Sequence, residues 1–177
     1  MKRIFPSLLS LLSLVSFPLL AQPADTRPAQ RAEMNKLDFL AGEWKGEGWI
    51  KMPGAPQQTF TQTETVRKKL DGLALLFEGH GTSQGKTVFE ALAMVTWDPE
   101  KGHYRFSSAT TEGRAGESEG RFVSGGAWEW GFALPQGGRI RYTIKLTDKG
   151  EWYETGEYSP DEKTWHQFHE MTLRKVN

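Results

Sequence analysis

Apolar and polar residues alternate along most of the chain after Glu43, and clusters of Gly, Pro, Asp and Lys interrupt this alternation at short intervals. Alternation with a period of two is typical of half-buried strands, and the interrupting clusters are typical of hairpin turns. A short helical pattern, NKLDFLAG, precedes the first strand, with Asn35 or Asp38 as a cap and Gly42 at its end. The pattern predicts strands over residues 43–51, 58–70, 73–83, 87–97, 103–110, 115–124, 127–134, 138–147, 151–158 and 164–175.

Short links without crossover helices indicate an antiparallel meander. A meander of this length leaves two exposed edges unless it closes on itself. We therefore expect an all-β fold, a closed up-and-down antiparallel barrel of about ten strands with a short N-terminal helix.

Two strands indicate which faces point inward. In RIRYTIKL, Tyr142 and Ile144 belong to an apolar face whose opposite face carries Arg, Thr and Lys. In AWEWGF, Trp128 and Trp130 share one face in the same way. We expect these four side chains to line the barrel interior.

The stretch FLAGEWKGEGW, residues 39–49, combines strand-forming residues with closely spaced glycines. Alternation places Trp44, Gly46 and Gly48 on one face, so one bulky ring is followed by two positions without a side chain. This arrangement predicts a barrel closed at one end by Trp44 with hollow space beside it. Alternatively, the glycines only relieve backbone strain at a corner of the barrel.

Several inward faces also carry a glutamate if the alternation is unbroken. The four faces are Phe60/Gln62/Glu64/Val66, Val88/Glu90/Leu92/Met94, Trp152/Glu154/Gly156/Tyr158 and Phe168/Glu170/Thr172/Arg174. A buried carboxylate must pair with a base, take up a proton, or contact water or a polar ligand. Three interpretations stay open: a small-molecule site, a strand bulge that turns the glutamates to solvent, or an acid–base pair for hydrolysis.

Composition limits the remaining possibilities. Lys2 and Arg3 followed by an apolar run predict a secretory signal peptide over residues 1–21, with cleavage near Ala21 or Ala24, and residues 22–35 are expected to form a flexible leader before a barrel domain at 36–177. The chain has no cysteine and balances 22 basic against 22 acidic residues, which disfavours disulfides, a lipid anchor, nucleic acid and stable membrane insertion after cleavage. We expect a periplasmic or secreted bacterial protein.

The motif GEWKGEG resembles the G-x-W-x-G-x-G signature of nitrobindin-like members of the calycin group, relatives of the lipocalins. The likeness extends over most of residues 36–176, including Phe60 to Glu64, Glu90 and the ending TLRKV. The chain also resembles a related family of exported bacterial barrels known only as a domain of unknown function. The nitrobindin resemblance implies haem held by a histidine of the last strand, at a position that is Phe168 here. His166 has the matching parity, and His169 reaches the interior only through a bulge.

These observations favour a binding protein without catalysis, which holds a small hydrophobic or amphipathic molecule inside the barrel and needs no metal or cofactor. The predicted lining is Trp44, Gly46, Gly48, Glu64, Glu90, Trp128, Trp130, Tyr142, Ile144, Phe168 and Glu170. One alternative is a haem protein with nitric-oxide or peroxynitrite chemistry, with His166 as ligand. Another is a filled barrel that acts as a protein-interaction module.

Overall fold

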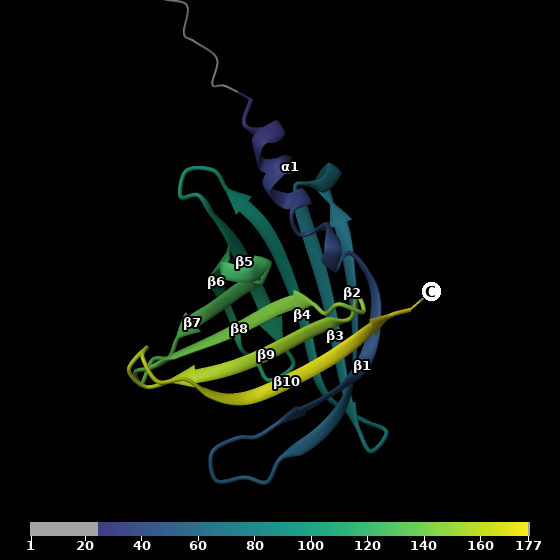
Figure 1. The fold of residues 1–177 in the computed structure, drawn as a ribbon, viewed down its shortest axis with the longest axis vertical. Coiled ribbons are helices and arrows are strands. Elements are labelled where there is room, and N and C mark those ends of the chain that lie inside the picture. Colours follow the sequence, from purple (N-terminus) through teal and green to yellow (C-terminus); the bar gives the residue numbers. More distant parts are fainter. Residues whose placement is uncertain (1–24, 177) are drawn as a thin grey trace, which may run out of the picture.

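Ten antiparallel strands close into one barrel in the computed structural model, which describes residues 25–176 (Figure 1). The strands are β1 (Gly42–Ile50), β2 (Gln58–Lys69), β3 (Ala74–Ser83), β4 (Lys86–Asp98), β5 (His103–Thr110), β6 (Ala115–Phe122), β7 (Trp128–Ala133), β8 (Arg139–Leu146), β9 (Trp152–Ser159) and β10 (His166–Lys175). Each strand pairs with its neighbours in the chain, and β1 pairs with β10 to complete the ring. The predicted all-β closed barrel is confirmed.

The helical segments are α1 (Arg27–Asn35) and three short 3₁₀ turns: η1 (Asp38–Leu40), η2 (Leu70–Gly72) and η3 (Ser124–Gly126). The expectation of a flexible leader over residues 22–35 is therefore wrong for the part that forms α1. A proline in the first turn pre-sets the helical backbone, and Met34 gives the helix a buried contact with the core. The predicted signal peptide lies outside the described residues. Among those residues, no helix is long and apolar enough to cross a membrane.

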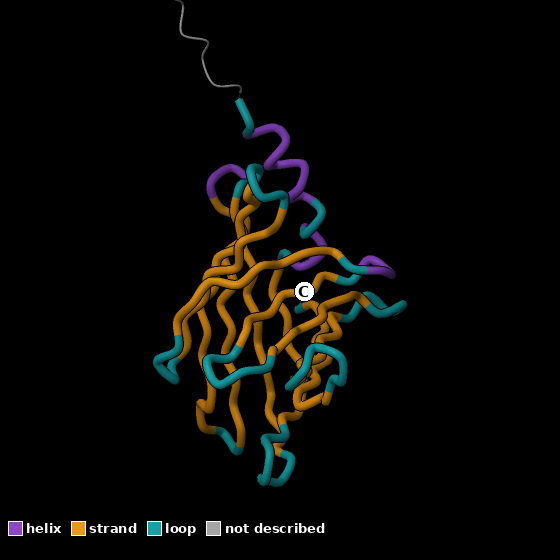
Figure 2. Tube along the Cα trace, turned by 90° about the vertical axis from the view of Figure 1, so that its left-hand side faces the viewer, coloured by secondary structure: helices purple, strands orange, loops and turns teal. Residues whose placement is uncertain are grey.

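The segment from α1 to η1 covers one end of the barrel, whereas hairpins form the other end (Figure 2). Met34, Leu37 and Leu40 are almost fully buried and belong to the main core. Two hydrogen bonds fix this cap: Tyr104 Oη donates to the Glu33 carbonyl at 2.9 Å, and Trp44 Nε1 donates to the Leu40 carbonyl at 2.8 Å. We call this end the capped end and the other the open end.

Strand β4 presents the opposite face to the one expected. Ala93 and Val95 are buried, whereas Val88, Leu92 and Met94 are exposed on the outside. Ala93 pairs with Phe77 of β3, whose ring occupies the lumen beside Phe106 with ring centres 6.2 Å apart. A small inward residue at position 93 accommodates these rings, and the neighbouring Leu92 and Met94 therefore point outward.

Strand β10 contains a bulge between Gln167 and His169. One extra residue reverses the alternation of the strand beyond it. As a result His169, Met171 and Leu173 face the lumen, with Met171 and Leu173 only 5% and 0% exposed. The expected inward set of β10 from Glu170 onward is therefore wrong.

Candidate functional site

The lumen at the capped end is filled by aromatic side chains. Trp44 and Trp152 meet edge to face with ring centres 5.7 Å apart, and Phe77 contacts Trp152 at 6.3 Å. Trp44, Trp128 and Trp152 are at most 2% exposed. This half of the interior is a packed core.

The inward side chains at the open end keep part of their surface accessible. This set consists of Phe60, Phe89, Trp130, Phe132, Ile140, Tyr142, Tyr158, Phe168 and His169. Trp130 stacks on Tyr142 with ring centres 4.5 Å apart and on Phe106 at 4.2 Å. The open end is thus an aromatic mouth above a solid core, and we call this set the mouth.

Two glutamates face the lumen in the middle of the barrel. Glu64 of β2 accepts a hydrogen bond from Gln62 Nε2 at 2.7 Å, and Glu154 of β9 accepts one from Trp152 Nε1 at 3.1 Å. Burial raises the pKa of Glu64 to about 7. Burial, together with the nearby charge of Glu64, raises the pKa of Glu154 to about 8. Among the described residues, no lysine or arginine forms an ion pair with either carboxylate.

Glycines of β3 provide the room for two of the polar side chains in the lumen. We use the term polar layer for Gln62, Glu64, Glu154 and His169. A Cβ at Gly79 would lie 2.6 Å from Glu64 Oε1, and one at Gly81 would lie 2.8 Å from Gln62 Oε1. Gly79 and Gly81 are the register partners of Glu64 and Gln62. Residues without a side chain therefore lie directly opposite Glu64 and Gln62 on the neighbouring strand.

His169 joins this interior through the β10 bulge. Its ring stacks on Phe60 with centres 5.6 Å apart and meets Tyr142 edge to face at 5.8 Å. Its register partner is Gly156, which has no side chain to separate the two rings. Burial lowers the pKa of His169 to about 4, so the imidazole is neutral at pH 7, and its buried Nδ1 has no hydrogen-bond partner among the described residues.

The glycines of β1 face inward as expected, but they leave no hollow. A Cβ at Gly46 would collide with the Thr172 carbonyl oxygen and lie 2.8 Å from Leu173 Cα. A Cβ at Gly48 would lie 2.5 Å from both the Glu170 carbonyl oxygen and Phe60 Cζ. The glycines allow β10 to lie close to β1, so the expected hollow beside Trp44 does not exist at these two positions.

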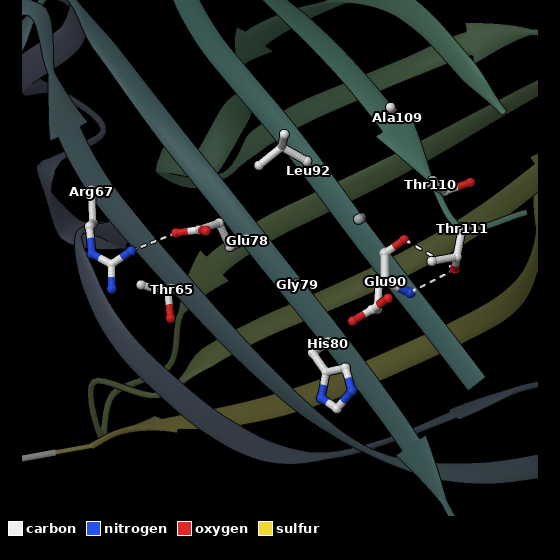
Figure 3. Close-up of a pocket in the computed structure, with 11 residues that line it drawn as sticks. Thr65, Arg67, Glu78, Gly79, His80, Glu90, Leu92, Ala109, Thr110 and Thr111 are labelled. Atoms are coloured by element: carbon white, nitrogen blue, oxygen red, sulfur yellow. Dashed lines mark hydrogen bonds and ion pairs between the residues drawn. The ribbon is translucent and has the colours of Figure 1, made fainter. Parts of the chain in front are cut away.

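Two of the expected lining glutamates lie on the outer surface. Glu90 is exposed on β4, beside Thr111 and His80 (Figure 3). It borders an open surface hollow of about 580 Å³. Glu170 faces outward beyond the bulge and accepts a hydrogen bond from Tyr153 Oη at 2.8 Å. His166, the alternative haem ligand, is exposed.

The other predicted lining residues face the lumen, at different depths. Trp44, Trp128 and Ile144 are buried in the packed core, whereas Trp130, Tyr142 and Phe168 belong to the mouth. Phe168 approaches Tyr142 edge to face with ring centres 5.9 Å apart. Their role in ligand binding stays a prediction.

Sequence reasoning did not select Glu154 or His169 as site residues. The inward position of Glu154 was expected from the alternation of β9, so the signal for it was present. For His169, the signal is that Met171 and Leu173 are apolar at the same parity. Among the described residues, no group of three or more His, Cys, Asp or Glu side chains is arranged to hold a metal ion.

Together, the closed sheet, the capped end and the aromatic mouth define an antiparallel ten-stranded barrel with a polar layer inside. The model of the family described as "Protein of unknown function (DUF1579)" matches residues 29–175, and the chain belongs to this family. Rv2717c from M. tuberculosis has a similar crystal structure, with a TM-score of 0.63 and 14% identity over 81% of this chain and 97% of that chain. At this identity the likeness concerns the fold. No curated protein matches the chain.

Proposed function

We propose that this protein binds a small amphipathic molecule at the open end of the barrel and releases it unchanged. The observation that carries the proposal is the contrast between the two ends. Trp44, Trp128 and Trp152 are almost fully buried at the capped end, whereas the aromatic side chains of the mouth all keep part of their surface exposed above a layer of polar groups. Small-molecule sites typically combine apolar walls with a few polar groups that orient the ligand.

The polar layer supports the expectation of an oriented ligand. Glu64, Glu154 and His169 each present hydrogen-bonding capacity that the protein itself does not fully use. Leaving such groups without partners costs free energy, and a ligand that pairs with them recovers it. A ligand would therefore place its polar end inward and its apolar part against the mouth.

The test is a tryptophan-quenching titration of the purified protein with long-chain lipids, hemin and aromatic amphiphiles. We expect a saturable change in emission that is reduced in Trp130→Phe, because Trp130 lies in the mouth. Trp165→Phe is the matched control, since Trp165 stacks on Arg141, with the guanidinium carbon 3.8 Å from the ring centre, outside the lumen. Unchanged emission with every compound would contradict the proposal.

A second candidate is haem binding, and one observation favours it. The β10 bulge turns His169 inward with a buried, unpartnered Nδ1. Haem bound there would supply an iron for nitric-oxide or peroxynitrite chemistry. Hemin should then produce a Soret band that is lost in His169→Ala and kept in His166→Ala; a band that survives both substitutions would rule out a ligand from β10.

A further inference from the structure

The polar layer contains two carboxylic acids whose negative charges would repel each other. Glu64 and Glu154 both face the lumen, and the charge of Glu64 disfavours ionisation of Glu154. Each carboxylate accepts only one hydrogen bond from a neutral side-chain donor, Gln62 or Trp152. Two lysines at the capped end make other contacts: Lys68 pairs with Asp38 at 2.6 Å, and Lys175 lies over the Trp44 ring with its Nζ 5.2 Å from the ring centre.

A positively charged group is the complement that this layer lacks. A cation would stabilise both ionised carboxylates, whereas an anionic ligand would be repelled by them. The side chains that face the two glutamates add no positive charge, because His169 is neutral and Tyr142 and Trp152 are uncharged. The guanidinium of Arg114 acts electrostatically on Tyr142, but its side chain is exposed and pairs with Glu112.

His169 provides a second observation, because one of its ring nitrogens lacks a hydrogen-bond partner within residues 25–176. Its Nδ1 is buried and has no hydrogen-bond partner among the described residues. Gly156, the register partner of His169, lies two residues from Glu154 on β9, so His169 and Glu154 are diagonal neighbours on the inner face. The tautomer protonated on Nε2 makes Nδ1 an acceptor that lacks a donor in the described part of the chain.

The aromatic side chains beside the polar layer also favour a cationic ligand. Trp130 and Tyr142 stack in the mouth and are aromatic groups whose faces attract positive charge. An alkylammonium group offers three N–H donors, which matches the acceptors on Glu64, Glu154 and His169 in number. The absence of a metal-ligand cluster among residues 25–176 points to an organic cation rather than a metal ion.

We propose that the ligand of this barrel is an amphipathic primary amine, whose ammonium group lies between Glu64 and Glu154 while its apolar part packs against the mouth. This inference rests on the proposed binding function and names the class of ligand. Fatty acids, which carry the opposite charge, should bind more weakly, because their carboxylate gains nothing from two acidic side chains.

The experiment compares three ligands of equal chain length: decylamine, decanol and decanoate. Binding is measured by tryptophan fluorescence and calorimetry, below the concentrations at which these compounds aggregate. We expect decylamine to bind at least about tenfold more tightly than decanol, and decanoate to bind more weakly still. Calorimetry in buffers of different ionisation enthalpy should show proton release on amine binding, because the cation favours the ionised carboxylates.

Substitutions of the two glutamates test whether these side chains cause the preference for the amine. Glu154→Gln and Glu64→Gln keep the shape of the side chain and should each reduce the preference for the amine by about tenfold. Glu90→Gln is the matched control, because Glu90 is an exposed glutamate on the outer face of β4. Near-ultraviolet circular dichroism verifies that each variant is folded.

The results of this experiment distinguish the amine assignment from the more general proposal that the barrel binds a small molecule. Equal binding of decylamine and decanol, or an amine preference that survives both Glu64→Gln and Glu154→Gln, overturns the amine assignment while the binding function stands. Absence of binding by all three compounds overturns the amine assignment, and it overturns the binding function as well when the lipids, hemin and aromatic amphiphiles also leave the emission unchanged.

Discussion

Glu154 is a carboxylic acid held inside the protein, away from water. Its side chain is buried, it accepts one hydrogen bond from Trp152, and Glu64 faces the same interior. The native state therefore keeps a proton that the unfolded chain releases near its ordinary pKa of 4.5. Between that value and about 8, the folded protein binds more protons, so the free energy of unfolding falls as pH rises.

Glu154→Gln should remove most of this dependence. Gln has a similar shape and does not titrate, so the variant should gain about 1–3 kcal/mol of stability relative to the wild type when the pH is raised from about 5 to about 8. Urea unfolding at both pH values measures the difference. A variant whose stability runs parallel to that of the wild type would show that Glu154 is not held protonated.

For individual residues, the sequence predicted the apolar lining of the barrel better than its polar groups. Alternation in β7, β8 and β9 placed Trp130, Tyr142 and Glu154 inward because nothing interrupts the period of two in those strands. Glu90 was misplaced because both faces of β4 are apolar, and the choice between them depends on Phe77 of a neighbouring strand. A contact between strands cannot be inferred from the period of one strand.

Strands β1 and β10 are paired neighbours that approach each other closely at Gly46. Gly46 lacks the Cβ that would collide with the backbone of β10, so a side chain there requires the two strands to separate. Gly46→Ala should therefore cost about 1–3 kcal/mol in the free energy of unfolding. Chemical denaturation measures this cost.

Gly116→Ala is the matched control within the same sheet. A Cβ at Gly116 of β6 would meet no atom within 4 Å, and its backbone does not require glycine. We expect this variant to be unchanged or slightly more stable, because alanine reduces the entropy of the unfolded chain. Equal destabilisation by both substitutions would contradict the close crossing of β1 and β10.

The elements themselves were predicted almost completely, whereas their irregularities were not. Turn residues mark the ends of each strand, so the ten strands follow from the sequence. The bulge in β10 left only an indirect signal, because Met171 and Leu173 contradict the face chosen from Phe168. Helix α1 was missed because its polar composition resembles a linker, and its buried contact at Met34 exists only once the barrel end is formed.

The whole molecule should unfold as one unit. The capped-end core contains buried residues from α1, η1 and most of the strands, and no strand edge separates one part of the closed sheet from another. Tryptophan fluorescence, which reports the core, and far-ultraviolet circular dichroism, which reports the sheet, should therefore give the same denaturant midpoint. A fluorescence transition that precedes the loss of sheet would indicate that the capped end opens independently.

Pairing of β1 with β10 joins strands from opposite ends of the domain. During synthesis, β1 emerges long before its partner on that side exists, so an unfinished chain carries an unpaired edge along Gly42–Ile50 and another along the most recently made strand. Ring closure has to wait for His166–Lys175 to leave the ribosome. A chain that stops short of that point would keep both edges unpaired, so loss of the last strand should leave the protein prone to edge-to-edge association.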